Sequence, residues 1–135
     1  HSAYHSPIMS SVPEEAFKLL PQSLFLKPNI HIIDGRGHIW SPYSTKLSEL
    51  YSYTLKNQVI ETYDFNSAIN VAIKEFTPDK LILLGPGNTL GGPIAQILIQ
   101  NSWLDIDSKK AFTNKQNNDP YLISMSIKKQ RKIVS

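Results

Sequence analysis

Apolar and polar residues follow two different periods along the chain, and these periods predict its helices and strands. Apolar side chains over 65–76 recur at helical spacing, which predicts an amphipathic helix. A weaker pattern of the same period covers 44–63, and the apolar run 92–100 also predicts a helix. Ser11 and Glu14 have the spacing of a capping box, so a helix is expected to begin at Ser11.

Short apolar runs predict strands, because they are too brief for helices of ordinary length. Residues 29–34 (NIHIID) are apolar and β-branched, and a turn is expected over 34–37. Residues 80–84 (KLILL) read as a strand buried on both faces of a parallel sheet, and 121–127 (YLISMSI) is a third candidate strand. The polar stretch 108–119 is expected to be an exposed loop. The order of helix, strand, glycine turn and helix predicts an α/β fold with parallel strands and flanking helices.

Composition narrows the class of protein. The 135 residues are 41% hydrophobic and 19% charged, as in a soluble globular domain. The chain has no cysteine, which excludes disulfides and thiolate metal sites, and no apolar run approaches the roughly 20 residues that span a bilayer. We therefore expect a cytoplasmic protein. The four histidines lack the spacing of a metal site, so no bound metal is expected; they are His1, His5, His31 and His38.

Charge is distributed unevenly along the chain. Residues 1–100 hold 7 basic and 8 acidic side chains, whereas 101–135 hold 7 basic and 3 acidic ones. A basic tail can attract nucleic acid, an anionic membrane or an acidic protein, or it can simply be solvated. We favour a solvated basic C-terminal extension over 101–135. Nucleic acid is not an expected partner, because the basic residues are not interleaved with aromatic ones.

Two loops are candidates for chemistry. Residues 85–92 (GPGNTLGG) lie between an expected strand and helix, where phosphate-binding loops occur. The glycine spacing fits neither of the common nucleotide motifs, so we favour a structural turn made by Gly85, Pro86 and Gly87. The other loop holds His5, where the following Ser6-Pro7 pair forces extended backbone. A lone loop histidine is weak evidence of catalysis by itself.

Taken together, the two loops carry a resemblance to a known family. Residues 2–9 (SAYHSPIM) resemble a segment of the form (S/H)-A-F-H-(S/T)-P-(L/I)-M, and 83–90 (LLGPGNTL) resemble a turn of the form x-V-G-P-G-x-x-L. Both segments are typical of malonyl-CoA:acyl-carrier-protein transacylases, the ACP S-malonyltransferases, and of polyketide acyltransferase domains. The resemblance covers residues 1–100. It implies the C-terminal portion of an α/β-hydrolase-like acyltransferase large subdomain.

The resemblance also implies a mechanism. In this family a serine of a G-H-S-x-G segment attacks the thioester of malonyl-CoA, and the histidine that matches His5 takes the serine proton. The other imidazole nitrogen is held by a main-chain carbonyl, expected here within 54–62. Malonyl-CoA is the implied substrate, acyl carrier protein the implied partner, and no cofactor is implied. The aromatic residue before the histidine, Tyr4 here, implies selection of malonyl over methylmalonyl groups.

The family's nucleophile does not occur in these residues, because no G-x-S-x-G segment is present. We therefore expect a C-terminal fragment that is inactive alone, with a non-catalytic module that docks an acyl carrier protein as the alternative. The strands near 30–34 and 80–84 are expected to lie in one parallel sheet, with His5 and the glycine turn on one face. Exposed edges imply a homo-oligomer, or cover by the tail strand 121–127.

Overall fold

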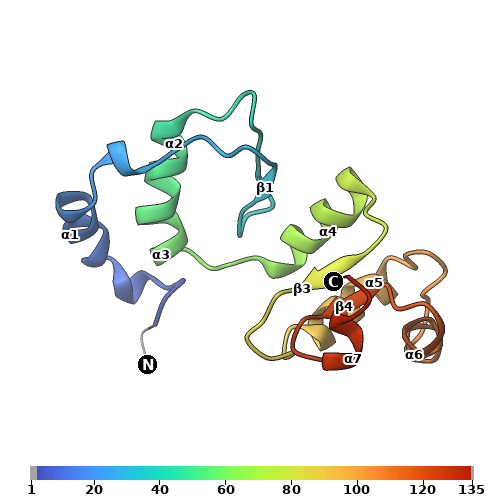
Figure 1. The fold of residues 1–135 in the computed structure, drawn as a ribbon. Coiled ribbons are helices and arrows are strands. Elements are labelled where there is room, and N and C mark those ends of the chain that lie inside the picture. The colour runs from blue at the N-terminus through green and yellow to red at the C-terminus, as the bar shows by residue number, and fades with distance from the viewer. Residues whose placement is uncertain (1–2, 135) are drawn as a thin grey trace. The chain divides into compact units, whose positions relative to one another are not determined.

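The computed structural model describes residues 3–134 and separates into two compact units, 1–71 and 72–135 (Figure 1). It is mixed α/β, with 48% helix and 9% strand, which confirms the α/β class. In the range 3–134, no helix has both the length and the apolar character needed to cross a membrane. The two units are described separately below.

The first unit consists mainly of short helical segments, three of which join into one longer helix over 47–60. This helix follows the pattern expected over 44–63, and it contains a π-helical turn in its middle. A helix also begins after Ser11 as expected, but Ser11 makes no capping hydrogen bond, so the predicted capping box is wrong. The helical segments are η1 (Pro7–Met9), α1 (Val12–Leu19), η2 (Gln22–Leu24), α2 (Leu47–Ser52), η3 (Tyr53–Asn57) and α3 (Gln58–Ile60).

A small hairpin completes the first unit. Strands β1 (Ile32–Ile33) and β2 (Ile39–Trp40) pair antiparallel around the expected turn 34–37, where Gly37 N donates to Asp34 O at 3.0 Å. The strand expected over 29–34 is therefore shorter than predicted. It also does not belong to a parallel sheet, because a tight turn returns the chain at once, whereas parallel pairing needs a crossover of a dozen or more residues.

The second unit has a parallel pair of strands covered by helices. Strand β3 (Leu81–Leu83) pairs with β4 (Leu122–Ser124), so the tail strand expected over 121–127 does cover an edge of β3. Helix α4 (Phe65–Phe76) crosses the boundary between the units, and Asp64 caps it by accepting from Ser67 N at 2.9 Å. The other helices are α5 (Gly91–Gln100), α6 (Lys109–Asn118) and α7 (Lys128–Arg131).

Three further predictions for the fold are wrong. Residues 108–119 are mostly helical rather than a loop, because Ser108 Oγ accepts from Ala111 N at 3.1 Å and caps α6. β3 is not buried on both faces, since Ile82 is 48% exposed. β1 and β3 do not share a parallel sheet: within the described part of the chain, β1 pairs only with β2 and β3 only with β4.

Candidate active site

His5 has an unusual backbone conformation. Its φ angle is +61°, in the left-handed region that non-glycine residues rarely occupy. Ser6 is extended, as the following proline requires, and its Oγ accepts from Ile8 N at 3.3 Å to begin η1. The His5 N–H donates to Val59 O at 2.8 Å, which ties the strained residue to the first unit. The matching segment begins at Ser2, which lies outside the described residues.

The His5 imidazole is held by a main-chain carbonyl. Nδ1 lies 2.6 Å from Gln58 O, within the range 54–62 in which the resemblance implies such a carbonyl. A carbonyl oxygen can only accept, so Nδ1 carries the proton in this contact. When the imidazole is neutral, Nε2 then carries the free lone pair. A histidine in this tautomer can accept a proton from a nucleophile that approaches Nε2.

The carbonyls of Gln58 and Val59 can accept from His5 because they lie at the C-terminal end of the long helix. The last four carbonyls of a helix have no partner within it. Gln58 and Val59 belong to α3, which ends at Ile60, and both carbonyls accept from His5 instead. The π-helical turn η3 comes directly before Gln58. The negative end of the helix dipole thus faces the imidazole.

Tyr63 lies on the other side of the histidine. The two rings meet edge to face, with their centroids 5.5 Å apart and an angle of 61° between the planes. The ring also lies directly on the turn glycine Gly35: a Cβ there would come within 2.6 Å of Tyr63 Cε2 and 2.9 Å of Cγ. Burial, and to a lesser extent the Asp34 carboxylate, raise the pKa of Tyr63 above its ordinary value.

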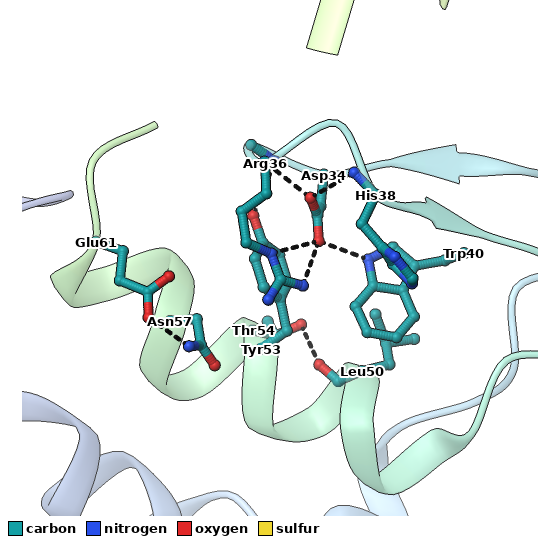
Figure 2. A network of polar contacts seen from close by, with 10 residues as sticks. Asp34, Arg36, His38, Trp40, Leu50, Tyr53, Thr54, Asn57 and Glu61 are labelled. Carbon is teal, nitrogen blue, oxygen red and sulfur yellow. Dashed lines mark hydrogen bonds and ion pairs between the residues drawn. The ribbon is translucent and has the colours of Figure 1, made fainter. Parts of the chain in front are cut away.

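The buried carboxylate of Asp34, the residue before Gly35, organises the hairpin (Figure 2). Asp34 is 5% exposed, and its Oδ1 accepts from Arg36 N at 2.8 Å and His38 N at 3.1 Å. Its Oδ2 accepts from Arg36 Nη2 at 2.7 Å and from Trp40 Nε1 at 3.2 Å. Burial acts to raise the pKa of Asp34, but these hydrogen bonds and the Arg36 charge outweigh it, so the pKa lies below its usual range.

The hairpin is in turn attached to the long helix. Tyr53, in the π-helical turn, accepts from Gly35 N through its hydroxyl at 2.9 Å. The Arg36 guanidinium stacks on the Tyr53 ring, with Cζ 4.3 Å from the ring centroid (Figure 2). Burial, the largest effect, raises the pKa of Tyr53. Sequence reasoning missed this network. A signal was present, because positions 36, 38 and 40 place potential donors at alternate residues after Asp34.

The other residues of interest have fewer contacts. Tyr4 is 55% exposed, and within the described chain no hydrogen bond or ring contact involves it. The turn at Gly85, Pro86 and Gly87 forms as expected, with φ angles of +104° and +76° at its two glycines. Ser126 Oγ donates to Gly87 O at 2.9 Å. This turn belongs to the second unit and His5 to the first, so their expected placement on one face stays a prediction.

No group of three or more His, Cys, Asp or Glu residues in the range 3–134 is arranged to hold a metal ion. Comparisons with protein-family models, with curated proteins and with solved structures found no match. The candidate site is thus defined by the geometry of His5, its carbonyl partner and the ring of Tyr63.

Proposed function

We propose that His5 is the general base of a Ser–His dyad in an acyltransferase that moves a malonyl group from CoA to an acyl carrier protein. The observation that carries the proposal is the 2.6 Å contact between Nδ1 and Gln58 O, which leaves Nε2 as the proton acceptor. The nucleophilic serine would come from a segment other than residues 1–135. The proposal places the enzyme in the cytoplasm and includes the α/β-hydrolase-like fold of the complete acyltransferase domain, of which residues 1–100 would be the C-terminal part.

In the proposed reaction, Nε2 of His5 passes protons between the serine oxygen and the two thiols, those of CoA and of the carrier protein. The serine hydroxyl gives its proton to Nε2 as its oxygen attacks the thioester carbon, and CoA leaves as the thiol after taking that proton. In the second half, the carrier-protein thiol gives a proton to Nε2 as its sulfur attacks the malonyl ester. The proton then returns to the serine oxygen, and the enzyme is regenerated.

The carbonyl partner suits both halves of this cycle. Each time Nε2 accepts a proton the imidazole becomes cationic, and Gln58 O then accepts a charge-assisted hydrogen bond from Nδ1. The negative end of the helix dipole favours the same charge. The positive φ angle of His5 adds support, because strained backbone that surrounding contacts maintain is common at active sites.

A second candidate is a non-catalytic module that docks an acyl carrier protein. The lack of a G-x-S-x-G segment in residues 1–135 favours it. The two candidates differ in one measurable property: only the enzyme transfers a malonyl group to the carrier protein and loses that activity when His5 is replaced.

The experiment measures malonyl transfer from labelled malonyl-CoA to an acyl carrier protein, using the protein purified from its native source. We expect His5→Ala to slow acylation about 10²–10⁴-fold, because that is the usual cost of losing a general base. His38→Ala is the matched control, since His38 is exposed and its ring contacts Trp40 rather than the candidate site. Acylation at a normal rate in His5→Ala would show that His5 is structural. Carrier-protein binding without transfer by the wild type would support the docking module.

A further inference from the structure

The ring of Tyr63 fills the space between the histidine and the hairpin turn. It contacts the His5 imidazole edge to face on one side, with centroids 5.5 Å apart, and covers Gly35 on the other. The backbone next to it is fastened to the same turn, because Asp64 N donates to Gly35 O at 2.7 Å. Tyr63 is 38% exposed, so most of the side chain is enclosed by these neighbours.

The surface on which Tyr63 rests is rigid. Gly35 is buried, its N–H donates to the Tyr53 hydroxyl, and its neighbour Asp34 accepts hydrogen bonds from Arg36, His38 and Trp40. A residue with a side chain at position 35 would press its Cβ against the Tyr63 ring, at 2.6 Å from Cε2. Real Cβ atoms do not approach other atoms so closely, and three ring atoms are affected, so the whole ring would have to move.

His5 needs such support. It is exposed, its backbone is strained at φ +61°, and Gln58 O is the acceptor that fixes its ring. A single hydrogen bond fixes the position of Nδ1 but leaves the ring free to tilt about it. Contact with an aromatic edge removes this freedom, because edge-to-face pairs have a preferred geometry.

We propose that Tyr63 is a positioning residue for His5. Position 35 is glycine because the Tyr63 ring occupies the space that a Cβ atom would take there. Tyr63 holds the imidazole in the plane in which Nδ1 donates to Gln58 O. It thereby keeps the proton on Nδ1 and the lone pair on Nε2. The catalytic consequence of this role rests on the proposed function, whereas the structural role does not.

Nuclear magnetic resonance tests the role through the two imidazole nitrogens of His5. Long-range ¹H–¹⁵N spectra of the full chain with labelled histidine report which nitrogen carries the proton. We expect the wild type to show the Nδ1–H tautomer. In Gly35→Ala and Tyr63→Leu, we expect the ratio of Nδ1–H to Nε2–H to fall about threefold to tenfold, the range of an aromatic pair contact. Tyr63→Phe keeps the ring and should retain the wild-type ratio.

Gly37→Ala is the matched control for loss of hairpin stability. Gly37 has a φ angle of +78°, so alanine strains the same turn, but its Cβ would meet Val71 and Ser67 rather than Tyr63. The proposal is overturned if the tautomer ratio stays at the wild-type value in Tyr63→Leu, or if it changes equally in Gly37→Ala. Should Gly35→Ala fail to fold, Tyr63→Leu decides the question alone.

Malonyl transfer separates this proposal from the function on which it rests. We expect Tyr63→Leu to lower kcat about threefold to tenfold and to leave the KM for malonyl-CoA unchanged, because Tyr63 acts through His5. A wild-type protein that transfers nothing would refute the proposed function, while the tautomer ratios would still decide the role of Tyr63. Active enzyme with wild-type kcat in Tyr63→Leu would refute only the positioning role.

Discussion

The interiors of the two units are built in different ways. In the part of the chain that the structure describes, all five of the largest fully buried side chains lie in the second unit: Ile73, Leu98, Ile106, Tyr121 and Ile123. The buried apolar side chains of the first unit are fewer, and one of them, Trp40, donates to the buried carboxylate of Asp34; they are Trp40, Tyr53, Leu55 and Ala68. The unit that carries the candidate site thus has the smaller apolar core.

The polar contacts of the two units differ as well. In the second unit, neutral amides bind the backbone of β4: Gln116 Oε1 accepts from Tyr121 N and Leu122 N at 3.0 Å, and Gln130 Oε1 accepts from Ser124 N at 2.8 Å. In the first unit, a charged carboxylate at Asp34 does this work. A carboxylate can be protonated within the ordinary pH range, whereas an amide cannot. Acid should therefore lower the stability of the first unit more than that of the second.

This contrast suggests why the site lies in the first unit. Packing of apolar side chains stabilises a fold without fixing the direction of a hydrogen bond. The imidazole of His5 needs a defined direction, and the first unit provides it through a series of hydrogen bonds and ring contacts that runs from Asp34 to Tyr63. Fully satisfied polar networks make their surroundings rigid and specify a single arrangement.

The largest effect is expected in the core of the second unit. Leu98→Ala removes a fully buried side chain, and such truncations cost about 2–5 kcal/mol in the free energy of unfolding. Hydrogen exchange measured residue by residue should show the loss in α5, β3 and β4. If His5 and the hairpin lose the same amount of protection, the units unfold as one and the comparison between them fails.

A smaller loss, confined to the first unit, is expected for Asp34→Asn. The change removes the buried negative charge that pairs with Arg36 and puts an amide donor near other donors. It should lower the free energy of unfolding by about 2–3 kcal/mol. Asp119→Asn is the control in the second unit. Asp119 is also paired with lysines, which lower its pKa to about 2, but it is exposed, so its replacement should cost much less. Equal losses would mean that burial of Asp34 has no special role.

The pH dependence of unfolding gives a second measurement of the same change. The pKa of Asp34 is lower in the folded chain than in the unfolded one, where it is about 3.9. Its contribution is therefore fully present above that pH and is lost as the pH falls through the folded-state pKa. We expect the free energy of unfolding of the first unit to fall below about pH 4, and to fall less steeply in Asp34→Asn.

The smallest effect on stability is expected at Tyr4, the exposed residue before His5. Tyr4→Ser should leave the stability of both units unchanged, because Tyr4 is 55% exposed. Under the proposed function, it should relax the preference for malonyl over methylmalonyl groups by about 10–200-fold, which is the range for exclusion of one methyl group by shape. Competition between malonyl-CoA and methylmalonyl-CoA measures this ratio. An unchanged ratio would remove Tyr4 from the substrate site.

Much of the secondary structure was predictable because its causes are local. The helical spacing over 65–76 and the turn over 34–37 depend on neighbouring residues, and the structure confirms both. The loop predicted over 108–119 failed for a different reason. Helix α6 is polar except for Ala111 and Phe112, and the contacts of Gln116 with the backbone of Tyr121 and Leu122 show which face packs inward.

Local patterns in the sequence were sufficient to predict most of the helices and the turn over 34–37, and the family resemblance pointed to His5 and to a carbonyl within 54–62. Local periodicity and backbone sterics are sufficient for elements of this kind. That Gln58 supplies the carbonyl and that Tyr63 lies on Gly35 follows from the tertiary contacts alone. They also set the partner and direction of each strand. Such contacts join residues far apart in the chain, and their geometry depends on how whole elements pack, which no local pattern encodes.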